Sequence, residues 1–230
     1  MQNLPTALTY EKEFTYMPWG ILIKEVQEYI TSNAPHNGKL LDILCGPGYL
    51  LGKLQKNRPD INYLGVDLEG EFIDHAKKLY PEISFEVADA FEWNSDELFD
   101  VVLCTAGVHH LPYEQQEPFI EKLSKLIKDD GFVIIGDPYI DDYSDEKTRK
   151  LAGAKLGYEY LAETISNDGT NDVIEAAVGV LSNDVLLIEY KSSVKKMKTL
   201  YEKYFSSVVM HKTWPKEETE YGDYYFILKK

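Results

Sequence analysis

The stretch Leu41-Asp42-Ile43-Leu44-Cys45-Gly46-Pro47-Gly48-Tyr49 joins a short apolar run to a glycine-rich turn and then to the start of a helical pattern. Glycines at such a turn let the backbone come close to a ligand. The first turn of the helix that follows offers unpaired N–H groups, which favour a polar or anionic ligand group. The stretch therefore predicts a strand, a ligand-binding loop and a helix, in that order.

Strand-like and helix-like patterns alternate on both sides of this loop, from about residue 39 to residue 139. This alternation is typical of a parallel sheet with crossover helices, so we expect an α/β, Rossmann-like, doubly wound fold. The expected strands are 39–44, 61–67, 83–87, 99–104 and 131–136, and the expected helices are 49–55, 72–79 and 114–127.

The pattern changes after Tyr139. We expect helices from Ser144 to about 167, from 171 to 181 and from 194 to 204, and two closing antiparallel strands over 206–210 and 224–228; residues 185–190 fit a strand or a helix equally well. The chain then divides into an N-terminal helical cap (1–30), a sheet domain (31–140 and 193–230) and a helical insertion that acts as a lid over the substrate site (141–192).

Composition narrows the possible partners. The 230 residues carry 24 Lys plus Arg and 39 Asp plus Glu, a net charge of −15, which argues against nucleic acid because that binding depends on phosphate neutralisation. Two cysteines exclude a disulfide framework, and we expect no metal site. We find no membrane-spanning apolar run, and Met1 to Pro5 does not resemble a signal peptide, so we expect a cytoplasmic protein.

Three acidic residues stand at expected strand ends: Asp42, Asp67 and Asp89. An acid at the end of the second strand can accept hydrogen bonds from both hydroxyls of a ribose. The spacing Gly46-x-Gly48-x-x-x-Gly52 also fits an NADP-type loop. However, Pro47 removes an N–H that a diphosphate would use, and Asp42 suits an ammonium group better than a phosphate. The ligand implied has adenine, ribose and an amino acid, as in S-adenosylmethionine.

Five elements in order resemble the successive motifs of class I S-adenosylmethionine-dependent methyltransferases of the small-molecule type. They are residues 41–48, 65–67, 87–90, 99–103 with 109–111, and 130–134, and the resemblance covers about residues 38–140. It implies a seven-stranded sheet whose last strand is antiparallel. The family usually has glycine where this chain has Leu44. The cofactor-binding candidates are Asp42, Gly46, Gly48, Asp67, Leu68, Asp89, Ala90 and Cys104.

His109 and His110 follow the fourth expected strand and are the candidate catalytic bases, because an imidazole can take a proton from a hydroxyl or an amine. Adjacent residues rarely face the same way, so we expect at most one of them in the site. The candidate substrate-binding residues are Tyr16, Trp19, Asp137, Tyr139 and Tyr158.

These residues predict an enzyme that transfers a methyl group from S-adenosylmethionine to oxygen or nitrogen of a small molecule, as a monomer or homodimer. Two alternatives stay open at this point. One is an NADP-dependent oxidoreductase. The other is a regulatory protein that binds S-adenosylmethionine without catalysis.

Overall fold

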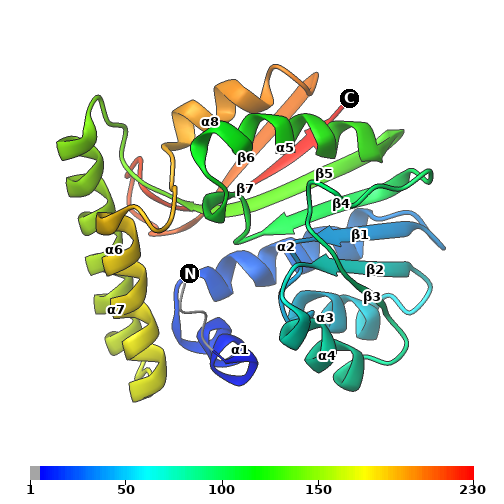
Figure 1. Ribbon diagram of the computed structural model, residues 1–230, viewed down its shortest axis with the longest axis horizontal. Coiled ribbons are helices and arrows are strands. Elements are labelled where there is room, and N and C mark those ends of the chain that lie inside the picture. Colours follow the sequence, from blue (N-terminus) through cyan, green and yellow to red (C-terminus); the bar gives the residue numbers. More distant parts are fainter. Residues whose placement is uncertain (1–5) are drawn as a thin grey trace.

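Seven strands form one sheet in the order β3-β2-β1-β4-β5-β7-β6 in the computed structural model, which describes residues 6–230 (Figure 1). Residues 1–5, which begin the expected cap and on which the expectation of no signal peptide rests, lie outside the described part. The strands are β1 (Lys39–Ile43), β2 (Asn62–Asp67), β3 (Ser84–Val87), β4 (Phe99–Thr105), β5 (Ile127–Tyr139), β6 (Ser207–Trp214) and β7 (Gly222–Lys229).

The pairing of the strands confirms the expected sheet. Strands β1 to β5 run parallel, whereas β7 is antiparallel to both β5 and β6. Strand β1 lies between β2 and β4, and Leu41 pairs with Leu64 on one side and with Val102 on the other. Because the chain order reverses there, the carboxyl ends of β1 and β4 flank the crevice at which open α/β sheets bind ligands.

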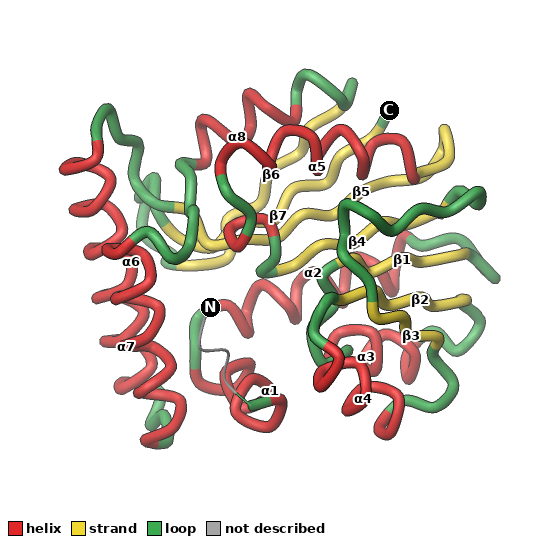
Figure 2. The backbone as a smooth tube through the Cα atoms, in the orientation of Figure 1, coloured by secondary structure: helices red, strands yellow, loops and turns green. Residues whose placement is uncertain are grey.

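Helices cover both faces of the sheet, as Figure 2 shows. On one face lie α2 (Trp19–Asn33), α3 (Tyr49–Asn57) and α4 (Gly70–Leu79). On the other face lie α5 (Tyr113–Leu126) and α8 (Val194–Tyr201). Each face therefore has its own buried apolar cluster, and the strands between them are apolar on both sides, as central parallel strands are.

Three further helices lie beyond the carboxyl ends of the parallel strands (Figure 1). They are α1 (Ala7–Tyr16), α6 (Glu146–Ser166) and α7 (Asn171–Leu186). Gly157 lets α6 pack closely on α7, since a Cβ at this position would lie 2.6 Å from Cα of Leu181. Helix α7 continues past its expected end at residue 181, so the ambiguous residues 185 and 186 are helical.

Strand β5 begins at Ile127, four residues before the expected start at 131, and β6 continues to Trp214 rather than ending at residue 210. Both extensions follow from pairing with a neighbour: Ile127 pairs with Phe99 of β4, and Trp214 pairs with Asp223 of β7. Within residues 6–230, every helix is too short or too polar to cross a membrane.

Candidate active site

The loop between β1 and α3 is shaped by residues in the left-handed backbone region. Gly46 has φ +53° and Gly48 has φ +74°, values that glycine adopts at no steric cost. At Gly48 a Cβ would also lie 2.8 Å from the ring of Phe85. Leu44 has φ +64° as well, although its side chain disfavours this conformation. The loop thus needs glycine at Gly48 and carries local strain at Leu44.

Asp67 fastens this loop to the end of β2. Its Oδ2 accepts a hydrogen bond from the Gly46 N–H at 2.8 Å, and its Oδ1 accepts one from the Glu69 N–H, also at 2.8 Å. Burial raises the pKa of the carboxyl, and these two N–H groups act in the opposite direction. Each oxygen keeps a lone pair, so Asp67 can still accept from a ligand hydroxyl.

Asp42 lies on β1 next to the loop, and its side chain is buried. Its Oδ1 has no hydrogen-bond partner among the described residues. Burial and the charge of Asp67 raise its pKa well above the usual value. A buried acceptor without a donor is costly, so this oxygen suits a ligand that brings its own donor, such as an ammonium group.

Helix α1 covers this part of the site. The crevice beside Asp42 has a volume of only about 20 Å³, and Tyr10 and Phe14 of α1 form one of its walls. The Phe14 ring stacks on Tyr49 of α3 with centroids 4.0 Å apart, and it lies 4.1 Å from the Trp19 ring. Aromatic packing therefore holds α1 over the loop.

The two histidines form a short turn, η1 (Val108–His110), after β4. Nδ1 of His109 lies 2.7 Å from Oδ1 of Asp137 on β5, and its Nε2 lies 3.7 Å from Oε2 of Glu189. The rings of His109 and His110 are 4.1 Å apart. Burial lowers the pKa of each imidazole to about 3, so both are neutral near pH 7. Burial raises the pKa of Asp137 to about 7.

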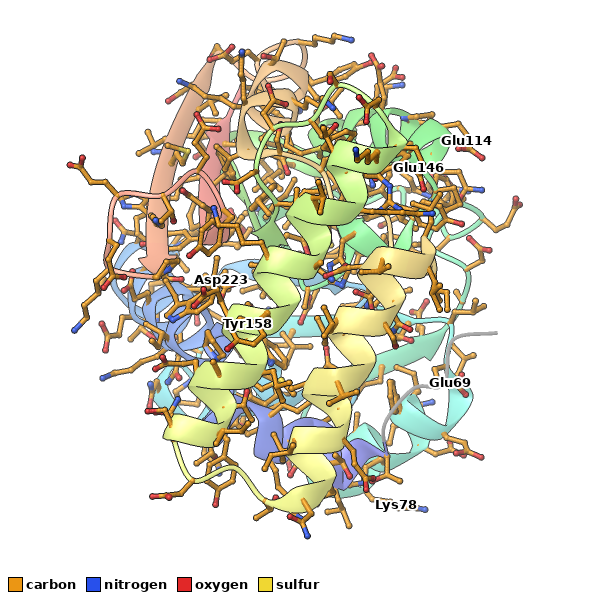
Figure 3. The ribbon with its side chains drawn as sticks, turned by 90° about the vertical axis from the view of Figure 1, so that its left-hand side faces the viewer. Glu69, Lys78, Glu114, Glu146, Tyr158 and Asp223 are labelled. Atoms are coloured by element: carbon orange, nitrogen blue, oxygen red, sulfur yellow. The ribbon has the colours of Figure 1, made fainter. Side chains whose placement is uncertain are left out.

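A cavity of about 550 Å³ opens between α1, η1, α6 and α7. Tyr10 and Trp19 line this cavity and also the crevice beside Asp42, so the two spaces share a wall. Figure 3 views the molecule from the side of α6 and α7, which lie side by side in front of the strand ends. The cavity wall also includes Glu13, His109, His110, Tyr160, Glu189 and Lys191.

A buried ion cluster joins the end of α7 to the cavity wall. The Lys191 ammonium contacts Oδ1 of Asp184 at 2.6 Å and also contacts Oε2 of Glu189. The two carboxylates raise the pKa of Lys191, and Lys191 lowers that of Glu189 below its usual range. Glu189 is therefore ionised and held in a fixed position beside His109.

Residues 40–131 match the model of a methyltransferase domain family. Carboxy-S-adenosyl-L-methionine synthase of Campylobacter lari is 28% identical over 132 residues, which are 56% of this chain and 55% of that protein. Trans-aconitate 2-methyltransferase of Shigella dysenteriae is 26% identical over 137 residues, which are 53% of this chain and 54% of that one. The chain thus spans about half the length of the curated relatives it matches.

Solved structures extend the likeness of the fold to most of the chain. The plantazolicin methyltransferase BpumL aligns with a TM-score of 0.64 at 13% identity, over 97% of this chain and 90% of that one. Magnesium protoporphyrin IX methyltransferase of Synechocystis PCC 6803, solved with bound S-adenosylmethionine, aligns with a TM-score of 0.59 at 14% identity, over 91% and 78%. Residues 40–131 therefore match a methyltransferase domain, and most of the chain has the fold of S-adenosylmethionine-dependent methyltransferases. S-adenosylmethionine is the cofactor of that family.

Six of the eight cofactor-binding candidates fall into two groups. Asp42, Gly46, Gly48 and Asp67 gather around the loop after β1. Leu68 and Asp89 lie at the surface nearby, where Oδ1 of Asp89 accepts a hydrogen bond from the Phe91 N–H at 2.7 Å.

Two cofactor-binding candidates are buried instead. The Ala90 side chain packs in the core beneath α5, so only its backbone is available to a ligand. The thiol of Cys104 is fully buried in the same core, so Cys104 too could offer a ligand only its backbone, and the next residue, Thr105, lines the crevice. Adjacent strand residues alternate between the two faces, and Cys104 takes the face toward α5.

His109 and His110 both line the large cavity, whereas we expected at most one of them to face the site. The tight η1 turn brings their rings together. Among the substrate-binding candidates, Trp19 lines the cavity, and Asp137 lies behind His109 and does not reach the wall.

Three of the candidate substrate-binding residues lie outside the cavity wall. Tyr139 packs in the core on the α8 side of the sheet, with its hydroxyl 3.1 Å from that of Tyr201, because strand alternation turns it away from the cavity. Tyr158 is 63% exposed on the surface of α6 (Figure 3), whereas Tyr160 of the same helix lines the cavity. Tyr16 packs partly buried against the core and is absent from the cavity wall.

Sequence reasoning missed Glu13, Glu189 and Lys191. The first had a usable signal, because Glu13 follows Tyr10 by three positions and precedes Met17 by four, which places an acid on the apolar face of α1. Glu189 falls in the ambiguous segment 185–190, and Lys191 follows it directly. The contact of the segment after α7 with η1, where the Tyr190 N–H donates to the His109 carbonyl, brings them to the site.

Proposed function

We propose that this protein transfers a methyl group from S-adenosylmethionine to an oxygen or nitrogen atom of a small molecule bound in the cavity. The observation that carries the proposal is the shared wall formed by Tyr10 and Trp19. One side of it faces the glycine loop and the other faces a cavity large enough for a small acceptor. A donor held at the loop and an acceptor held in the cavity would therefore meet across a short boundary.

The methyl donor, S-adenosylmethionine, is held by the residues around the loop. Asp42 receives the ammonium group at the amino-acid end, since its buried Oδ1 has no hydrogen-bond donor among the described residues. Asp67 receives the ribose hydroxyls through the lone pairs left on its two oxygens. Gly46 and Gly48 keep the backbone accessible, and Asp89, exposed after the end of β3, receives the adenine end. S-adenosylmethionine, when bound, supplies an electrophilic methyl group on a positively charged sulfur.

Helix α1 acts as a movable cover in this proposal. A crevice of about 20 Å³ beside Asp42 is far smaller than the amino-acid end of the donor requires. Tyr10 and Phe14 therefore move aside when the donor enters and return to exclude water once it is bound. Lid motions of this kind are common in enzymes that must protect a reactive centre.

The pair His109–Asp137 serves as the proton acceptor. When Asp137 is ionised it accepts the Nδ1–H of His109, which leaves the Nε2 lone pair facing Glu189 and the cavity. A proton taken at Nε2 lies beside the ionised Glu189, which offsets part of the burial that lowers the pKa of this imidazole to about 3. General bases of this kind accelerate reactions by about 10²–10⁴-fold.

The alternatives have less support. An NADP-dependent oxidoreductase needs a loop that binds a diphosphate. The loop here lies next to the buried carboxyl of Asp42, which is a poor neighbour for a diphosphate because both groups are acidic. A binding protein without catalysis would not need a buried histidine–carboxylate pair on the wall of an acceptor-sized cavity. Both features support a methyltransferase.

The test is calorimetric titration of the protein with S-adenosylhomocysteine. We expect micromolar binding, weakened at least tenfold in Asp67→Ala and unchanged in Asp74→Ala, an exposed acid of α4 that serves as the control. Equal binding by Asp67→Ala and the unmodified protein would refute the assigned site. An absence of binding by the unmodified protein, with tight NADPH binding instead, would refute the proposed cofactor.

A further inference from the structure

Glu13 is a buried acid that the proposed mechanism does not use. It lies on the wall of the large cavity, and only 6% of its surface is exposed. Its carboxyl makes no side-chain hydrogen bond or ion pair within the described part of the chain. Burial and the charge of Glu189 raise its pKa to about 8. A buried carboxyl without a partner is costly to keep, so its place on a cavity wall points to a ligand that supplies the missing donor.

The charges around the cavity are predominantly negative. Among the described residues, its wall holds four acids, Glu13, Asp172, Glu175 and Glu189, and one cation, Lys191. Asp172 is also paired with Lys12 outside the wall, and Glu13 is protonated near pH 7 until a cation beside it favours the ionised form. Lys191 is already engaged by Glu189 and Asp184, and the two histidines are neutral. An anionic acceptor would be repelled by this wall, whereas a cationic one would be attracted.

The remaining wall suits the body of such a ligand. Tyr10, Trp19 and Tyr160 contribute aromatic surface close to the carboxyls. Aromatic faces stabilise an ammonium group through their quadrupoles and also bury the apolar carbon atoms attached to it.

A metal ion is the competing cationic occupant. His109, His110 and Glu189 each offer a ligand atom, and these atoms lie within 4.8 Å of one another. However, the Lys191 ammonium contacts the same Glu189 oxygen, so a divalent ion there would lie next to a fixed positive charge. Glu13, which carries the argument for a missing donor, is not part of that group.

We propose that the methyl acceptor is a primary or secondary amine, bound as an ammonium ion by Glu13 in the acidic, aromatic cavity beside His109. The proposal rests on the proposed function and decides between oxygen and nitrogen. It also distinguishes this cavity from one built for a carboxylate such as trans-aconitate, the compound named for several curated relatives.

The chemistry balances with the residues present. The bound ammonium gives one proton to Nε2 of His109, which exposes the nitrogen lone pair. The nitrogen then forms a bond to the methyl carbon of the donor while the carbon–sulfur bond breaks, and that electron pair stays on sulfur. The products are a methylated ammonium ion and S-adenosylhomocysteine, and the proton on the His109–Asp137 pair returns to solvent.

The test compares matched probes that differ in one group. Benzyl, phenethyl, cyclohexylmethyl and hexyl scaffolds, each as the amine, the alcohol and the carboxylate, are titrated calorimetrically into protein saturated with S-adenosylhomocysteine. We expect at least one amine to bind ten or more times more tightly than its alcohol, and the matching carboxylate not to bind. Glu13→Gln should reduce that preference to less than threefold, whereas Glu28→Gln, an exposed acid of α2 outside the cavity wall, should keep it.

Each other outcome overturns the inference. If no amine binds more tightly than its alcohol, or if Glu13→Gln keeps the preference while its thermal unfolding shows an intact fold, Glu13 does not recognise an ammonium. If Glu13→Gln fails to fold, Glu13→Asp replaces it, and an unchanged preference in a shortened side chain counts against the proposal. Saturable Zn²⁺ binding with no amine binding would assign the cavity to a metal. Because saturation with S-adenosylhomocysteine is measured first, a failure of the proposed function is recognised separately.

Discussion

Nδ1 of His109 and Oδ1 of Asp137 lie 2.7 Å apart, and both side chains are buried. The carboxylate fixes the ring so that Nε2 faces the cavity, and burial raises the pKa of Asp137 to about 7. Because a protonated Asp137 no longer holds the Nδ1–H tautomer, the pair loses its capacity as a base below this pH.

Asp137→Asn should therefore lower kcat for methyl transfer by about 10²–10⁴-fold, because the amide does not stabilise a proton on His109. The rate of the unmodified protein should rise with pH through about 7, and the variant should lose this rise. The measurement is methyl transfer to the amine selected by the matched probes. Affinity for S-adenosylhomocysteine serves as the control and should change less than twofold; a variant with unaltered kcat would remove His109 from its proposed role.

Phe14→Ala should loosen α1, because this ring stacks on Tyr49 and lies against Trp19. If α1 must move before the donor enters, S-adenosylhomocysteine should associate severalfold faster with the variant, and it should also dissociate faster. Stopped-flow tryptophan fluorescence, to which Trp19 beside Phe14 contributes, follows both rates. Phe205→Ala removes a buried ring on the opposite face of the sheet and should change neither rate. Equal association rates in all three proteins would show that α1 does not limit entry.

The central part of the fold was predictable because its signals are local. Short-range sequence patterns predict the alternation of strands and helices over residues 39–139 and the glycine turn at Gly46 and Gly48. The structure confirms these elements. Asp42 and Asp67 were also accessible to sequence reasoning, since the carboxyl ends of parallel strands share one edge of the sheet.

The cavity was harder to predict because it depends on tertiary packing. Tyr139 and Tyr158 were chosen as aromatic residues near the expected site, but strand alternation and helix rotation turn both away from it. Glu189 and Lys191 reach the cavity because the segment that follows α7 contacts η1. The sequence around residues 189–191 contains no pattern that predicts this contact.

Stability should fall as the pH rises from 6.5 to 8. Burial raises the pKa of Glu13 to about 8 and those of Asp137 and Asp223 to about 7. These acids are ionised in the unfolded chain above pH 5 but protonated in the folded protein, so unfolding releases protons and higher pH favours it. Each group contributes a slope of up to about 1.4 kcal/mol per pH unit until it ionises in the folded state.

The two buried histidines act in the opposite direction, but only at lower pH. Their folded-state pKa values near 3 make stability fall as pH drops below about 6.5. Above that pH the acids dominate. Urea unfolding at pH 6.5, 7.0, 7.5 and 8.0 measures the slope, and Asp223→Asn should reduce it, since Oδ2 of Asp223 has no partner to lose. A slope that is flat or positive in the unmodified protein would contradict the assigned protonation states.

Leu44 stands in the left-handed region at φ +64°. For a residue with a Cβ this conformation costs about 1–2 kcal/mol, and glycine avoids that cost. Comparing Leu44→Gly with Leu44→Ala separates backbone strain from the loss of the leucine side chain, because both variants remove its packing. Leu44→Gly should be more stable than Leu44→Ala by about 1 kcal/mol, the reverse of the usual order within regular structure.

Chemical denaturation measures the difference, and the same pair at Leu51, which lies within α3, should show the usual order. A Leu44→Ala variant as stable as Leu44→Gly would mean that the loop relaxes away from the left-handed region once leucine is removed.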